Sequence, residues 1–146
     1  MHSYVVNTNI DIAVFSDFYN WLKSHIIGNT ANDSRSMLRL KHENQPIFTR
    51  ADIYITDIEE NQKFLSVHYT SVSKELINIY LAQHAMIMRS ELPDKFNGRL
   101  GFSRYIRNID STKTTILPPE NQMHRDFLNN DAAKLRLLEV ITLSPL

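Results

Sequence analysis

One histidine has an acidic residue within reach across a predicted hairpin. His68 belongs to the run QKFLSVHYTS, and Asp57 belongs to the run RADIYITDIE that precedes it. If the loop is centred on Asn61 and Gln62, Asp57 lies diagonal to His68 on one face of the hairpin. A carboxylate beside an imidazole orients the ring and raises its pKa, which prepares a general base. His68 with Asp57 is therefore the candidate catalytic pair of a small metal-independent nuclease or phosphodiesterase.

The rest of the sequence argues against an enzyme. The pattern histidine-x-threonine occurs once, as HYT, so the twin pattern of two-histidine phosphoesterases is absent. None of the six histidines is two to four residues from another, and the three glycines cannot build a phosphate-binding loop. We therefore favour a non-enzymatic protein and expect no metal and no cofactor.

A basic and aromatic segment, KFNGRLGFSRYIRN from Lys95 to Asn108, is the strongest binding signal. It holds four basic side chains and no acidic one in a chain whose formal net charge is zero. At helical spacing its aromatic and aliphatic residues separate from its arginines, whereas neither face of a strand would be clean. A helix is therefore predicted over 99–109. The residues expected to contact a partner are Lys95, Arg99, Arg104, Tyr105 and Arg107.

The arginines of this segment suit phosphate or carboxylate, because the planar guanidinium donates two parallel hydrogen bonds. The segment therefore fits a nucleic-acid backbone or an acidic protein surface, and the neutral total charge slightly favours protein. The acidic stretch 52–60 could also meet segment 95–107 of a second copy, which would make a homo-oligomer or an assembly subunit of a larger complex. The main hypothesis is a binding, inhibitor or adaptor module with a macromolecular partner.

Composition and length predict an ordinary globular domain. The chain has 146 residues, of which 42% are hydrophobic and 22% charged, and this length suits a single domain over 1–146. No cysteine is present, so disulfides are excluded, which fits a reducing cytoplasm. No window approaches the roughly 20 apolar residues of a membrane span. We expect a soluble cytoplasmic protein without a membrane partner.

Hydrophobic periodicity predicts the elements that position these residues. A strand is expected over 3–10, a helix over about 12–27 with Asp11 as its cap and Gly28 at its end, and a short strand over 37–41. A hairpin over about 51–71 follows. The next helix, about 73–92, carries an apolar stripe that includes Ile87 and Met88 and stops at Pro93.

The hairpin register and the C-terminal elements complete the prediction. The loop centred on Asn61 and Gln62 puts one set of residues on the core face: Tyr54, Thr56, Ile58, Leu65, Val67 and Tyr69. An extended piece is expected over 111–117, a short helix over about 120–128 and a strand over about 135–143. The fold class is α+β, a small antiparallel sheet with two main helices packed on it.

Overall fold

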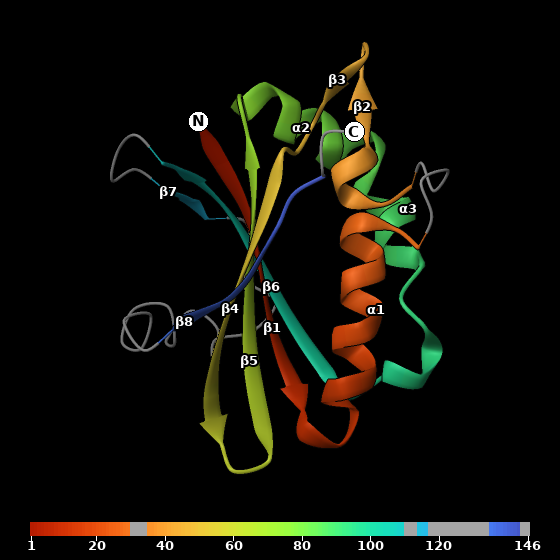
Figure 1. The fold of residues 1–146 in the computed structure, drawn as a ribbon, viewed down its shortest axis with the longest axis vertical. Coiled ribbons are helices and arrows are strands. Elements are labelled where there is room, and N and C mark those ends of the chain that lie inside the picture. Colours follow the sequence, from red (N-terminus) through yellow and green to blue (C-terminus); the bar gives the residue numbers. More distant parts are fainter. Residues whose placement is uncertain (30–34, 110–113, 117–134, 144–146) are drawn as a thin grey trace.

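Six strands form one antiparallel sheet in the part of the computed structural model that is described, residues 1–29, 35–109, 114–116 and 135–143 (Figure 1). Their order across the sheet is β7-β6-β1-β5-β4-β8. The strands are β1 His2–Asp11, β4 Arg50–Glu59, β5 Gln62–Ser71, β6 Leu100–Asn108, β7 Thr114–Ile116 and β8 Arg136–Ile141. A separate ladder pairs β2 Lys41–His42 with β3 Gln45–Pro46.

Two main helices, α1 Phe15–Ile27 and α2 Lys74–Gln83, lie on the same face of the sheet, and the short α3 Ala85–Ser90 follows α2 (Figure 1). Asp11 accepts a hydrogen bond from the Ala13 N–H and begins a 3₁₀ turn, Ile12–Val14, before α1. Gly28 ends α1 with a φ of 83°, a left-handed value that glycine adopts without strain. Ser73 caps α2 by accepting from the Leu76 N–H at 3.2 Å.

The central elements follow each other as β1-α1-β4-β5-α2-β6, with β1 and β5 in the middle of the sheet. This order is the split βαβ arrangement of ferredoxin-like domains. Strand β7 extends the sheet beside β6, and β8 extends it beside β4. The predicted α+β class and the antiparallel sheet with two main helices are confirmed.

The β4–β5 hairpin is confirmed, but its predicted register is wrong by three residues. Ile53 pairs with Val67, and the ladder shifts between Asp57 and Glu59, next to a turn at residues 60 and 61. Because side chains alternate between the faces of a sheet, an odd shift reverses the face of one strand. The β5 residues predicted to face the core, Leu65, Val67 and Tyr69, are buried. The β4 residues on the same face are not the predicted ones but Ala51, Ile53 and Ile55.

The predicted helix over 99–109 is wrong, because residues Leu100–Asn108 form strand β6 against β1. Both faces of β6 are partly covered: Ser103 is 4% exposed on one face and Ile106 is 3% exposed on the other. A strand covered on both sides shows no alternation of polar and apolar residues. The mixed pattern of polar and apolar residues was therefore misinterpreted as the periodicity of a helix.

Two further predictions differ in detail, the strand over 37–41 and the helix over 73–92. Residues Met37–Arg39 form a 3₁₀ turn, not a strand, and only Lys41–His42 pair as β2. The predicted long helix over 73–92 is interrupted at His84, so Met88 is buried while Ile87 is 52% exposed. Strands are confirmed within the expected pieces 111–117 and 135–143, and the helix predicted over 120–128 lies outside the described residues.

The core between helices and sheet contains a cluster of aromatic rings. Tyr4 of β1 lies 5.4 Å from Tyr80 and 6.1 Å from Phe48, measured between ring centroids, and Phe48 lies 5.1 Å from Tyr80. Tyr69 of β5 completes the cluster 6.3 Å from Tyr4. All four rings are at most 2% exposed. Among the described helices, none is long and apolar enough to cross a membrane.

The corrected register predicts which isoleucines stabilise the fold. Replacing Ile53 with Ala should lower the free energy of unfolding by about 2–5 kcal/mol, because the side chain is 0% exposed. The matched control Ile87→Ala should change it by about 0.5 kcal/mol or less, because that side chain is half exposed. Urea denaturation measures both. Equal losses in the two variants would contradict the register and the interrupted helix.

Candidate functional site

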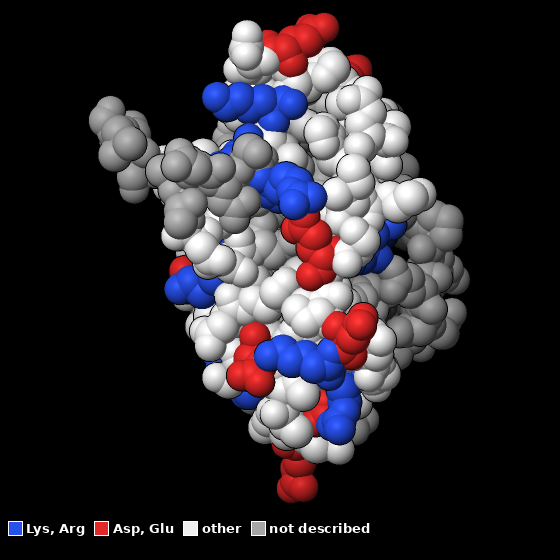
Figure 2. All heavy atoms as spheres, turned by 90° about the vertical axis from the view of Figure 1, so that its right-hand side faces the viewer, with Lys and Arg blue, Asp and Glu red and all other residues white. Residues whose placement is uncertain are grey.

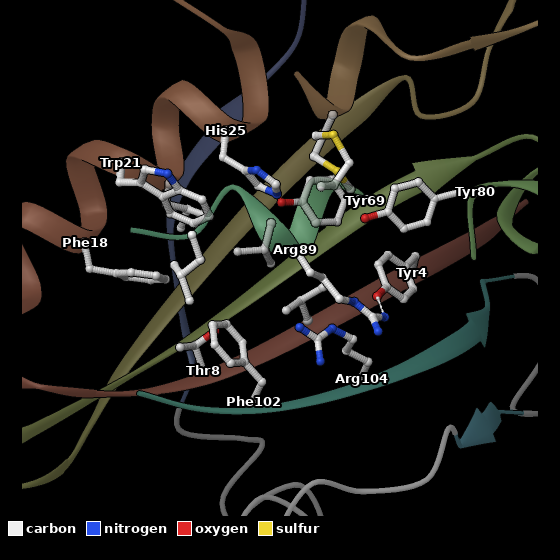
Figure 3. Close-up of a pocket in the computed structure, with 16 residues that line it drawn as sticks. Tyr4, Thr8, Phe18, Trp21, His25, Tyr69, Tyr80, Arg89, Phe102 and Arg104 are labelled. Atoms are coloured by element: carbon white, nitrogen blue, oxygen red, sulfur yellow. Dashed lines mark hydrogen bonds between the residues drawn. The ribbon is translucent and has the colours of Figure 1, made fainter. Parts of the chain in front are cut away.

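A pocket of about 320 Å³ opens between the helices and the sheet (Figure 3). Residues of β1, β5 and β6 form its floor, and residues of α1, α2 and α3 form its walls. This volume is at the lower end of the range of pockets that hold small molecules. The pocket lies on the helix-covered face, so its lining depends on which side chains the sheet register turns to that face.

Two arginines from different elements line the pocket. Arg89 of α3 donates a hydrogen bond through Nη2 to the Tyr4 hydroxyl at 3.1 Å. Arg104 of β6 has its guanidinium over the Phe102 ring, with the guanidinium carbon 5.0 Å from the ring centroid. No aspartate or glutamate is among the described residues that line the pocket. The charged side chains of the described lining are thus these two arginines.

Phenol groups add neutral donors to the same pocket. Burial, and then the neighbouring tyrosines, raise the pKa of Tyr69 and of Tyr80 above the ordinary value. Both side chains therefore remain protonated at neutral pH and keep a hydroxyl to donate. Tyr4, whose hydroxyl accepts from Arg89, lies beside them (Figure 3).

His25 of α1 also lines the pocket. The His25 ring stacks on Trp21 with 4.7 Å between centroids, and its Nδ1 atom is buried without a hydrogen-bond partner. Burial, and then the charge of Arg104, lower the pKa of His25 to about 4. The ring is therefore neutral near pH 7, and the positive charge of the pocket comes from the two arginines.

Aromatic and aliphatic side chains form the other end of the pocket. Phe18 and Trp21 of α1 lie there, away from Tyr4 and Tyr80 (Figure 3). Their rings are 5.7 Å apart between centroids. Leu22 and Phe102 also line the pocket. The site thus has a cationic, hydroxyl-bearing end and an apolar end.

The structure does not bring the predicted partner-binding residues together. Arg104 faces the helices and lines the pocket, whereas Tyr105 and Arg107 both lie on the opposite face of β6. Arg107 is exposed and shares the second face of the sheet with His68, whose pKa its charge lowers. The arginine face that a helix would create is therefore divided between the two sides of the sheet.

The other two predicted cations are in ion pairs. Lys95 Nζ lies 3.8 Å from an Asp17 carboxylate oxygen, and Arg99 Nη1 lies 2.9 Å from an Asp11 carboxylate oxygen. Basic and acidic side chains are interspersed on the helix side of the molecule (Figure 2). The described residues on this face form no broad area of one sign.

His68 lies on the second face, with partners other than the predicted one. Its Nε2 is 3.0 Å from the Ser66 hydroxyl, and Asp52, not Asp57, is opposite it on β4. In the backbone ladder, position 57 is opposite position 63 near the end of the hairpin. The prediction that Asp57 orients His68 is therefore wrong, because it depended on the register.

The pKa of His68 also differs from the expectation. Burial, and then the charge of Arg107, lower it to about 4, and the opposing effect of Asp52 is smaller. Asp52 itself accepts a hydrogen bond from Arg50 at 2.6 Å. His68 is thus neutral at pH 7. No group of three acidic or histidine side chains that could hold a metal ion occurs among the described residues.

Sequence reasoning did not select Arg89, Tyr4 or Trp21. Arg89 follows the buried Met88, and a cation at the edge of an apolar helix stripe was the one signal available. Tyr4 and Trp21 were indistinguishable from core residues, because most large aromatic side chains are buried for packing. Their place in a pocket depends on contacts between elements distant in sequence.

Fold and pocket together define a split βαβ domain with a cationic pocket between its helices and its sheet. The chain belongs to a family described as a domain of unknown function, DUF4286, whose model matches residues 1–109. The matched range includes β1 through β6 and the described residues that line the pocket. Comparisons with curated proteins and with solved structures found no match.

The two lowered histidine pKa values predict acid sensitivity. Folded His25 and His68 have pKa values of about 4, whereas an unfolded histidine has about 6.5. Between these values the unfolded state binds more protons, so the free energy of unfolding should fall as the pH falls from about 6.5 to about 4. The His68→Gln variant lacks one of these two histidines, so its free energy of unfolding should fall less over this pH range than that of the wild type.

Urea denaturation of both proteins at pH 7 and pH 5 measures this loss. His68 faces Ser66, Asp52 and Arg107, and the variant leaves all three in place. The same loss in both proteins would contradict a buried neutral His68.

Proposed function

We propose that this protein is a non-enzymatic binding module whose ligand is a small anion with an apolar part, held in the pocket between helices and sheet. The observation that carries the proposal is that two arginines from different elements, Arg89 of α3 and Arg104 of β6, line one pocket together with tyrosine hydroxyls. The absence of glycine-rich loops and of a metal-binding cluster among the described residues fits binding better than catalysis.

An anion suits this site because of what surrounds the guanidiniums. Hydrogen bonds between a guanidinium and an anion are stronger than neutral ones, and partial exclusion of water strengthens them further. The hydroxyls of Tyr69 and Tyr80, which are protonated at neutral pH, can donate to the same anion. A neutral ligand would leave the two charges without this gain.

The macromolecular partner predicted for segment 95–107 stays a prediction. Two of its cations lie on opposite faces of the sheet, and the other two are in ion pairs. The pocket is therefore the better supported binding site. Self-association through 52–60 and 95–107, and a nuclease that uses His68, likewise stay predictions. A cysteine-free chain fits a reducing compartment, and we propose the cytoplasm.

Two methionine substitutions on one strand test the proposal. Arg104→Met should weaken the binding of carboxylates and phosphate esters about tenfold, because it removes a charge-assisted hydrogen bond. Arg107→Met, on the opposite face of β6, should leave binding unchanged. Thermal melting with each anion and with its uncharged amide or alcohol measures both. Equal stabilisation by the charged and the uncharged compounds would contradict an anion site.

The macromolecular alternative has its own experiment. Wild-type protein is titrated with mixed DNA and RNA across salt concentrations, because phosphate contacts weaken as salt rises. Salt-dependent binding that Arg107→Met abolishes and Arg104→Met retains would move the functional site to the second face of the sheet. The present proposal predicts no such binding.

A further inference from the structure

We infer that the ligand is an aromatic monocarboxylate, with its carboxylate at Arg89 and Arg104 and its ring against Phe18, Trp21 and Phe102. This inference rests on the proposed function, since it specifies the ligand of the same pocket. It follows from the arrangement of the lining side chains. Arg89 and the tyrosine hydroxyls lie toward Tyr4 and Tyr80, Arg104 lies between them and Phe102, and Phe18 and Trp21 of α1 lie at the other end (Figure 3).

The cationic end fits a carboxylate. A guanidinium edge and a carboxylate are both planar and form two parallel hydrogen bonds. Arg104 lies over the Phe102 ring at 5.0 Å, and Arg89 is tied to the Tyr4 hydroxyl at 3.1 Å, so contacts within the protein orient both groups. Two oriented guanidiniums can thus bind one carboxylate without much further ordering.

A phosphate ester is a poorer fit for the same atoms. The charges of the pocket are side-chain guanidiniums, and its described lining includes no glycine and no helix N-terminus to supply the backbone N–H groups that cradle phosphates. His25 adds no charge near pH 7, since burial lowers its pKa to about 4. The cost of desolvating a dianion among apolar walls is also larger, because the Born cost rises with the square of the charge.

The apolar end fits a ring better than a flexible chain. Phe18 and Trp21 are 5.7 Å apart between centroids, and Phe18 also meets Phe96 edge to face at 5.6 Å. Aromatic rings gain from such edge and offset contacts beyond the area that they bury. A rigid ring also loses less conformational entropy on binding than an alkyl chain does. The pocket volume of about 320 Å³ limits the ligand to a small acid.

Trp21 provides the readout, because it is the single tryptophan of the chain and lines the pocket. Wild-type protein is titrated with hydrocinnamate, hexanoate, phenethyl phosphate and hydrocinnamamide while tryptophan fluorescence is recorded. Hydrocinnamate should bind about tenfold more tightly than each of the other three, because each lacks either the ring, the carboxylate geometry or the charge. The Arg107→Met variant should give the same ranking.

The four compounds separate the two proposals. Tighter binding of hexanoate or phenethyl phosphate would overturn the aromatic monocarboxylate and leave the anion-binding function standing. Binding of hydrocinnamamide as tight as that of hydrocinnamate would overturn the anion-binding function itself. A response to none of the four compounds at millimolar concentration would overturn the monocarboxylate, and the broader anion series in the melting experiment would then decide the function.

A substitution in the apolar end gives a second test that does not depend on the charge. Phe18→Leu keeps an aliphatic group of similar reach but removes the ring. The preference for hydrocinnamate over hexanoate should then fall below tenfold, because one of the three rings that contact the ligand is lost, while hexanoate affinity stays unchanged, provided that circular dichroism shows the native fold. A tenfold preference for hydrocinnamate that survives this change would contradict the proposed position of the ring.

Discussion

The antiparallel pairing of β6 with the central strand β1 is the constraint on which the site depends. Arg104 is opposite Val6 and Ser103 is opposite Asn7, so neighbouring residues of β6 face opposite sides of the sheet. This register turns Phe102 and Arg104 toward the helices and Tyr105 and Arg107 away from them. A shift of one residue would exchange the two sets and remove the charge from the pocket.

An aromatic layer lets the pocket hold two cations in an otherwise apolar part of the molecule. Tyr4 is fully buried in the cluster with Phe48, Tyr69 and Tyr80, yet its hydroxyl accepts a hydrogen bond from Arg89. The face of an aromatic ring attracts a guanidinium, as Phe102 does for Arg104. Rings and phenols thus contribute to holding both guanidiniums in the pocket.

The local elements could be predicted from the sequence because short-range patterns encode them. The strand over His2–Asp11 and the hairpin follow from alternation, and the Asp11 cap follows from a side-chain hydrogen bond to nearby backbone. The end of α1 at Gly28 follows from the positive φ that glycine adopts. The core residues of β5 were predicted correctly for the same reason. These features do not depend on how distant elements meet.

The features that define the site depend on contacts between elements distant in sequence, and these features were missed. One bulge and the position of the turn set the face of β4, so His68 has Asp52 opposite it instead of Asp57. Coverage on both faces of β6 concealed its alternation, and the arginines were therefore assigned to one helix face. Arg89 and Tyr4 are 85 residues apart in sequence, and only the packing of α3 near β1 brings them into contact.

The central claim is that Arg89 and Arg104 bind a carboxylate in one pocket while Arg107 lies outside it. Proton–nitrogen NMR spectra that resolve the arginine Nε–H groups test this directly during a titration with hydrocinnamate. We expect the Nε–H signals of Arg89 and Arg104 to shift together along one saturable curve, while that of Arg107 stays in place. A shift of the Arg107 signal with no change at Arg104 would contradict it.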